Sequence, residues 1–306
     1  MSLRRFRAVF AAEFGHFFRR PLILILALII VLTAFGLSSG QMSISSGDSS
    51  VGGTKAWITS EFAQTQMMTY LVLLYFSFFL AIAAGLTLLR DHETKADAVV
   101  LATPVTAAEY VWGRYLAVLS GFALLLLLQA GADAFWNHAV PNGAVNEIRG
   151  PFAAGSYFTP ALMIGLPFLV FFGGVSLYVG ERTRNAVLVY LLPVFALLFC
   201  GFFLWEWSPA WLDLRVNRLL MVLDPAGFRW LNETYLKVDR GVAFYNHAHV
   251  GYDGLFWLNR AWLLIGGLGA VFLTQRAVAA SRRGAATARD RAAVRSAGAP
   301  GRGGAP

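Results

Sequence analysis

Residues 90–117, RDHETKADAVVLATPVTAAEYVWGRYLA, form a polar stretch between two long apolar runs. Its first half mixes charged residues with small apolar ones at helical spacing, which predicts a short amphipathic helix. Pro104 ends that helix, because proline lacks the amide hydrogen and restricts the residue before it. A second helix is expected to begin near Thr106, an N-cap residue with Glu109 three positions later. The segment therefore predicts a charged elbow that projects from one side of a membrane.

The composition of the chain is that of an integral membrane protein. Its 306 residues are 57% hydrophobic and 14% charged, and their mean hydropathy is +0.59. Each apolar run has about 17 to 23 residues, which is enough to cross a hydrocarbon core of about 30 Å at about 1.5 Å per residue. The predicted fold class is all-α, with six transmembrane helices at residues 21–37, 67–89, 115–135, 157–179, 186–205 and 256–274.

Three other segments complete the predicted organisation around a membrane domain at residues 21–276. Residues 1–20 interleave five arginines with five phenylalanines, which is typical of an amphipathic helix in the membrane interface. A secretory signal peptide is the alternative, but the apolar run begins late and no soluble domain follows a cleavage site. The longest polar connection, residues 206–255, includes an expected surface helix at 214–223. Residues 277–306 are rich in Ala, Gly and Arg and are predicted to be disordered.

Charge distribution predicts the orientation of the chain. With the N-terminus in the cytoplasm, 17 of the 25 Lys and Arg residues fall on the cytoplasmic side, as the positive-inside rule requires. Both termini and the elbow at residues 90–114 are therefore expected in the cytoplasm. Membrane topology thus accounts for the formal charge of +8 without nucleic-acid binding. Arg outnumbers Lys by 22 to 3, which fits a GC-rich bacterial background, so a bacterial plasma (inner) membrane is the expected location.

The spans carry few groups that could perform chemistry. None has an ionisable residue at its centre, where a charge is costly and usually serves transport. Asp133, Glu206 and Arg260 lie toward the outer ends of their spans, where solvation is expected. Cys200 is the single cysteine, which excludes an internal disulfide and a metal site built on thiolates.

Two further patterns concern ligands. His247 and His249, with Asp253, could supply ligands for a divalent metal, but three such residues in a polar loop are more commonly solvated. The chain has no Walker A sequence, so any ATP would have to be bound by another subunit.

The elbow resembles a known family in the order of its features. It begins with an acidic cluster, which is followed by a Leu-x-Thr-Pro-Val-Thr sequence. A Tyr-x-x-Gly-Arg sequence then begins the next membrane helix. This order is similar to the cytoplasmic coupling loop of ABC-2 type transporter permeases, although Thr94-Lys95 stands where family members often have Gly-Thr. Residues 224–262 are also similar to the first membrane half of permease/aminopeptidase fusion proteins, without any H-E-x-x-H sequence. The matching positions of the elbow are Arg90, Glu93, Leu101, Thr103, Pro104, Val105, Tyr110, Gly113 and Arg114.

The resemblance implies that the chain is the membrane-spanning permease subunit of an ATP-binding cassette transporter, paired with itself or a similar subunit. A separate ATPase subunit would bind ATP and Mg²⁺, so this chain would hold no cofactor and would not be an enzyme. Closure of two ATPases would move the second and third spans through the elbow, usually to export a substrate. The residues expected to bind the ATPase are Arg90, Asp91, Glu93, Asp97, Leu101, Thr103, Pro104, Tyr110, Gly113 and Arg114.

Other classes of protein stay open. A non-transporting membrane scaffold or assembly factor would use the same elbow to bind a different protein, without dependence on ATP. The elbow would also fit an ordinary amphipathic loop of some other polytopic protein. An intramembrane enzyme is the least favoured class, since no span contains paired catalytic residues.

Overall fold

The computed structural model describes residues 2–42, 55–93, 103–140, 146–209 and 211–297. Every regular element in these residues is helical, and three of the long helices contain a π-helical stretch. These stretches are Val72–Phe76 between α3 and α4, Ala161–Gly165 between α7 and α8, and Phe199–Trp205 after α9. The helices are α1 (Leu3–Phe17), α2 (Pro21–Ser38), α3 (Glu61–Leu71), α4 (Ser77–Glu93), α6 (Ala107–His138), α7 (Ala154–Pro160), α8 (Leu166–Thr183), α9 (Ala186–Leu198), α10 (Leu214–Leu223), α11 (Phe228–Leu231), α12 (Val242–His247) and α13 (Gly254–Ala297).

Six helical segments are long and apolar enough to cross a membrane, which confirms the predicted all-α chain with six spans. Most of them extend beyond the apolar runs, because polar residues at the end of a helix lower the hydropathy without ending the helix. The second span, for example, begins at Glu61 and not at residue 67. The six segments are Pro21–Ser38, Glu61–Asp91, Ala107–His138, Ala154–Thr183, Ala186–Trp205 and Gly254–Arg283.

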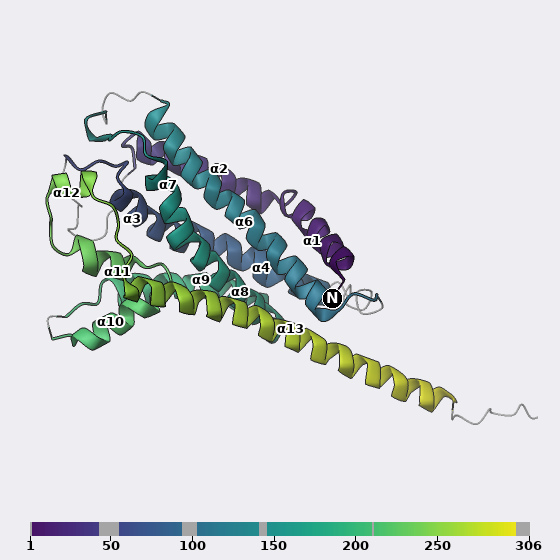
Figure 1. Cartoon of the computed structure of the whole chain (residues 1–306). Coiled ribbons are helices and arrows are strands. Elements are labelled where there is room, and N and C mark those ends of the chain that lie inside the picture. The colour runs from purple at the N-terminus through teal and green to yellow at the C-terminus, as the bar shows by residue number, and fades with distance from the viewer. Residues whose placement is uncertain (1, 43–54, 94–102, 141–145, 210, 298–306) are drawn as a thin grey trace, which may run out of the picture.

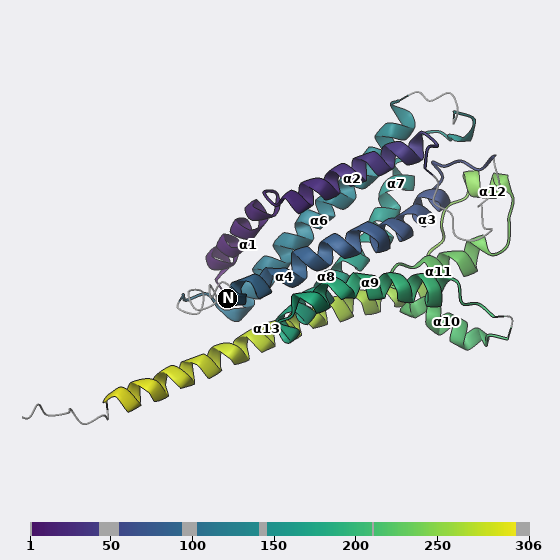
Figure 2. The same ribbon diagram turned by 180° about the vertical axis from the view of Figure 1, so that it is seen from behind.

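The bundle has two different ends (Figures 1 and 2). At one end, here called the elbow end, lie α1, the end of α4 and the start of α6. At the other, here called the loop end, lie α10, α11 and α12. The N-terminus and the last part of α13 are both at the elbow end, as six spans require. Which end faces the cytoplasm stays a prediction.

α13 corrects the prediction for the C-terminal segment. It runs from Gly254 to Ala297 as one 44-residue helix and projects from the elbow end, whereas the sequence predicted disorder from residue 277. Residues 277–297 consist mainly of Ala and Arg, which are among the best helix formers. The helix therefore continues past the apolar part of the chain, while residues 298–306 lie outside the described part.

α6 supports the first two helices along its length. α1 and α2 follow it in the same direction: Phe17 packs against Phe122 with ring centroids 5.5 Å apart, and Phe35 packs against Trp136 at 5.1 Å. A helix of 32 residues extends about 48 Å, which exceeds a hydrocarbon core of about 30 Å. α1 is thus a helix bound to one end of α6, and its position in the membrane interface stays a prediction.

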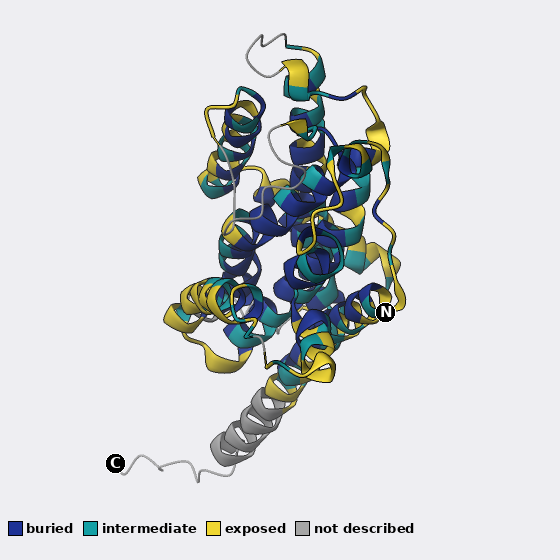
Figure 3. Cartoon of the chain, turned by 90° about the vertical axis from the view of Figure 1, so that its left-hand side faces the viewer, coloured by how far each residue is buried: buried dark blue, intermediate teal, exposed yellow. Residues whose placement is uncertain are grey.

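Glycines allow close contact at the centre of the bundle, where buried residues line the meeting faces of the long helices (Figure 3). Gly174 of α8 faces Gly267 of α13, and Gly180 of α8 faces Gly85 of α4. A Cβ atom added to Gly174, Gly180 or Gly267 would collide with backbone atoms of the opposite helix. Small residues let membrane helices approach in this way and gain van der Waals contact.

We expect Gly267→Ala to destabilise the bundle by about 1–3 kcal/mol, because the added methyl group overlaps the carbonyl of Val170. Gly269→Ala is the matched control, since nothing lies within 4 Å of a Cβ at that position and alanine favours the helix. Unfolding of the detergent-solubilised protein by SDS, followed by circular dichroism, measures both changes. Equal stability of the two variants would contradict the close contact of α8 with α13.

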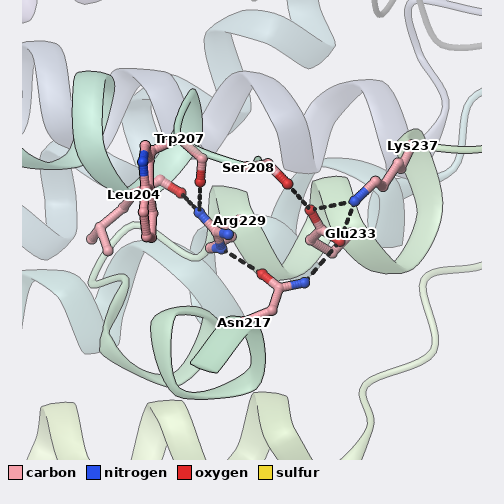
Figure 4. A network of polar contacts seen from close by, with 7 residues as sticks. All are labelled: Leu204, Trp207, Ser208, Asn217, Arg229, Glu233 and Lys237. Atoms are coloured by element: carbon pink, nitrogen blue, oxygen red, sulfur yellow. Dashed lines mark hydrogen bonds and ion pairs between the residues drawn. The ribbon is translucent and has the colours of Figure 1, made fainter. Parts of the chain in front are cut away.

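The polar connection at the loop end is folded around Arg229 (Figure 4). α10 forms at the predicted residues 214–223. The guanidinium of Arg229, which is 1% exposed, donates to the carbonyl oxygens of Leu204 at 2.5 Å and Trp207 at 3.0 Å. Its Nε donates to Oδ1 of Asn217 on α10 at 2.8 Å. One buried side chain thus joins the end of the fifth span to α10 and α11.

Carboxylates next to Arg229 extend this network. Glu233 accepts from the Asn217 amide at 3.0 Å and pairs with Lys237 at 2.9 Å. Burial alone would raise the pKa of Glu233, but the contacts with Lys237 and Asn217 and the charge of Arg229 outweigh it, so the pKa is lowered. Burial raises the pKa of Asp224, against the opposing effect of the backbone amides of Arg229 and Ala226 that donate to it.

We expect Arg229→Met to destabilise the protein by about 3 kcal/mol, because two buried carbonyls and the Asn217 side chain would lose their donor. Arg218→Met on the exposed face of α10 is the control and should change stability by less than about 0.5 kcal/mol. The SDS unfolding midpoint of each variant tests this difference. A midpoint for Arg229→Met within error of wild type would show that the network contributes little.

Two ionisable residues of the spans are buried, contrary to the predicted solvation. Asp133 is 2% exposed and Arg260 is 3% exposed, whereas Glu206 is exposed as expected. Arg260 lies over the Phe256 ring at 4.8 Å and is attracted to Asp224. Both side chains are enclosed by protein, although the hydropathy profile places them near water.

Candidate coupling site

The candidate coupling site is built where the last turn of α4 meets the first turns of α6. Arg114 of α6 pairs with Asp91 of α4, with 2.8 Å between Nη2 and Oδ2. The Tyr110 hydroxyl donates to the same carboxylate oxygen, and the Arg114 guanidinium lies 4.6 Å from the centroid of the Tyr110 ring. Arg114 Nη1 also donates to the carbonyl of Thr87 at 2.8 Å. These contacts join the second span to the third.

Glu13 brings α1 into the same cluster. It is 9% exposed and accepts from Arg20 Nη2 at 2.5 Å, while Arg114 Nε lies 3.9 Å from its other oxygen. Burial lowers the pKa of Arg20; Glu13 opposes this shift, and the charges of Arg90 and Arg114 add to it. The cluster therefore brings arginines close to one another. The carboxylates of Glu13 and Asp91 offset the repulsion between their charges.

Glu109 attaches the beginning of α1 to the beginning of α6. The predicted cap is confirmed: Thr106 and Glu109 form a capping box, with the Thr106 amide 2.9 Å from Glu109 Oε2. The same buried carboxylate also accepts from the amide of Ser2 and pairs with Arg5, whose Nε lies 3.2 Å away. A capping residue recognised in the sequence thus has a second role that the sequence did not show.

α13 completes the site from the other side. Arg282 donates to the carbonyl of Val105, and its guanidinium lies 5.8 Å from the Tyr110 ring centroid. Trp112 Nε1 donates to Gln275 Oε1 at 2.8 Å. The start of α6 is therefore held by α1, α4 and α13 together.

The predicted partner-binding residues divide into two groups. Asp91, Tyr110, Gly113 and Arg114 face other helices: a Cβ on Gly113 would lie 2.9 Å from Cγ1 of Val9 in α1. Arg90, Thr103 and Pro104 are exposed on the surface of the elbow end. Glu93 ends α4, with its side chain outside the described part, and Asp97 and Leu101 also lie outside the described residues.

The sequence interpretation missed the acidic and basic partners contributed by the terminal helices. Glu13 is the single acidic residue within residues 1–20, among arginines and phenylalanines. That isolation could have marked it as a buried partner for arginine. The roles of Arg5 and Arg282 carried no such signal, because each depends on contact between segments far apart in the chain.

The two histidines of the loop end, His247 and His249, contact different partners. His247 packs against the Trp57 ring with centroids 4.9 Å apart, while His249 Nδ1 lies 2.8 Å from Glu61 Oε2. Asp253 accepts from Trp230 Nε1 at 2.9 Å. Within the described residues, no group of three or more His, Cys, Asp or Glu side chains is arranged to hold a metal ion.

Comparison with protein-family models and with curated proteins finds no match to this chain.

We expect the Asp91–Arg114 pair to show a coupling energy of about 1–3 kcal/mol in a double-mutant cycle, because the two charges are largely shielded from water. The cycle compares Asp91→Asn, Arg114→Gln and the double variant by SDS unfolding. Arg218→Gln, at an exposed position of α10, should change stability by less than about 0.5 kcal/mol. Strictly additive effects of the two single variants would mean that the pair does not join α4 to α6.

Proposed function

We propose that this protein is the permease subunit of an ATP-binding cassette transporter, in which the elbow binds a separate ATPase subunit. The observation that carries the proposal is the Asp91–Tyr110–Arg114 cluster, which attaches the elbow to two neighbouring spans at once. A displacement of the elbow would move both spans, because separating α4 from α6 at this end would break a shielded ion pair.

The surface of the elbow would make the contact with the ATPase. Arg90 precedes and Pro104 follows the segment at residues 94–102, and both are exposed. We assign the contact with the partner to this surface, whereas Tyr110 and Arg114 would transmit the force from within. This division assigns different roles to residues that the family resemblance groups together. ATP and Mg²⁺ would be bound by the partner, and this chain would contribute the membrane pathway.

The proposal also includes a second permease subunit and a bacterial plasma membrane. α9 and the π-helical turns after it expose Phe195 and Phe202 by 63% and 73%, and such faces must be covered by lipid or by another membrane helix. The excess of Lys and Arg on the elbow side supports a cytoplasmic position for the elbow. Export is the direction that the family resemblance favours.

The test is affinity purification of the tagged, detergent-solubilised protein from its native membrane, with mass spectrometry and an ATPase assay. Wild type should recover a protein that carries a Walker A sequence and hydrolyses ATP. The surface variant Arg90→Ala, Pro104→Ala should lose that protein by about 10-fold or more. Arg114→Gln should retain it, but the permease should no longer alter its ATPase rate.

Arg218→Ala, exposed at the loop end, is the control and should behave as wild type. If well-behaved wild-type protein recovers no Walker-type ATPase, the permease proposal fails. Recovery of another protein through the elbow, unaffected by ATP, would instead support a non-transporting scaffold or assembly factor.

A further inference from the structure

A cavity of about 320 Å³ lies at the loop end, between the end of α2, the first turns of α3 and the end of α6. It is as large as the smaller ligand sites of proteins, which begin at about 300 Å³. Apolar side chains form part of its wall, among them Leu37, Met67 and Ile148. Polar side chains form the rest, and they come from α2, α3 and α6.

The polar wall contains amide, hydroxyl and carboxyl oxygens, and each of its two glutamine amides makes a hydrogen bond within the protein. Gln64 Nε2 donates to the carbonyl of Ile58 at 2.9 Å, and Gln66 Nε2 donates to the Tyr70 hydroxyl at 3.3 Å. Asn137, which is 5% exposed, lines the cavity, and its Oδ1 is buried without a hydrogen-bond partner. An unpartnered buried carbonyl oxygen is costly and is satisfied by a ligand or a water that donates.

A single carboxyl group supplies the charge of the wall. Asp133 lies one turn before Asn137 on α6, and its Oδ2 accepts from Gln129 Nε2 at 2.7 Å. Gln129 Oε1 is itself buried and without a partner. Among the described residues that line the cavity, none is Lys, Arg or His. Arg149 is near the rim, but its guanidinium is engaged by the carbonyl and hydroxyl oxygens of Ser38, at 3.0 and 3.1 Å.

We propose that this cavity binds a small organic ammonium ion, namely a protonated primary amine with a short apolar body. An ammonium group has three donors and no acceptor, so it can donate to the carboxylate and to the amide and hydroxyl oxygens of the wall. Its charge would pair with Asp133, and its apolar body would contact side chains such as Leu37 and Met67. An anion would face oxygen atoms, and a divalent metal would find only one carboxylate where it requires several oxygen ligands.

Ligand binding at this site can be tested separately from any role in ATP-driven transport. The site is built by α2, α3 and α6 at the loop end, whereas the candidate coupling site is at the elbow end (Figure 1). Binding can therefore be measured on the purified chain alone, and its outcome does not depend on whether an ATPase partner exists.

The test is isothermal titration calorimetry of the full-length protein in detergent at pH 7 with phenethylamine, which is protonated at that pH. The neutral analogue 2-phenylethanol is the ligand control, and titration into empty micelles corrects for partition. Asp133→Asn preserves the shape of the side chain and should weaken amine binding by at least ~10-fold, as expected for the loss of one charge-assisted hydrogen bond. Binding of the alcohol should be weak and unchanged.

Glu147→Gln is the matched control variant, because it removes an exposed carboxylate next to Ile148 without altering the cavity wall. It should bind the amine as wild type does. Ala63→Phe places a ring in the cavity from α3 and leaves Asp133 intact, so it should abolish binding even if Asp133→Asn does not fold.

Three results would overturn the proposal. One is the absence of saturable binding of the amine to wild type up to about 10 mM. Another is equal affinity for phenethylamine and 2-phenylethanol, which would indicate an apolar cavity without charge selection. The third is unchanged amine binding by folded Asp133→Asn or Ala63→Phe protein, which would place the bound amine elsewhere.

Discussion

A charge removed from water must be paired, and at the elbow end this constraint acts through Arg114. Its guanidinium contacts Asp91 of α4 and approaches Glu13 of α1, while its own helix supplies the Tyr110 ring. Attraction between opposite charges strengthens as water is excluded, and an unpaired partner would be left at a cost of several kcal/mol. These contacts fix the positions of α1, α4 and α6 along one another, which their hydropathy alone would not do.

α6 extends this constraint across the whole molecule. It is 32 residues long and carries Tyr110 and Arg114 near its start, and Asp133 and Asn137 near its end. The elbow end is stabilised by ion pairs, whereas the wall of the cavity at the loop end has one carboxyl group among neutral acceptors. A continuous α-helix is stiff along its axis, so α6 would transmit a displacement from one of its ends to the other. If both proposals hold, α6 is the physical link between partner binding and ligand binding.

The fold class could be predicted because it depends on local properties of the chain. Runs of apolar residues long enough to cross a membrane appear in the sequence as such, and all six were found. The capping box at Thr106 and the surface helix at residues 214–223 also depend on neighbours within a few positions. The C-terminal part of α13 was missed for the opposite reason: its polar, Ala- and Arg-rich composition resembles that of a disordered tail, although the same residues favour a helix.

The helical spans, their order and the charged elbow between the second and third could be predicted from local sequence. Which charges at the elbow end are internal and which are exposed depends on tertiary packing, because Glu13, Asp91 and Arg114 meet from three separate helices. Packing also encloses Asp133 at the wall of a cavity, where the hydropathy profile suggested contact with water. Hydropathy records the preference of each residue for its surroundings. Whether a charge meets water, a partner or a cavity depends on how distant segments pack.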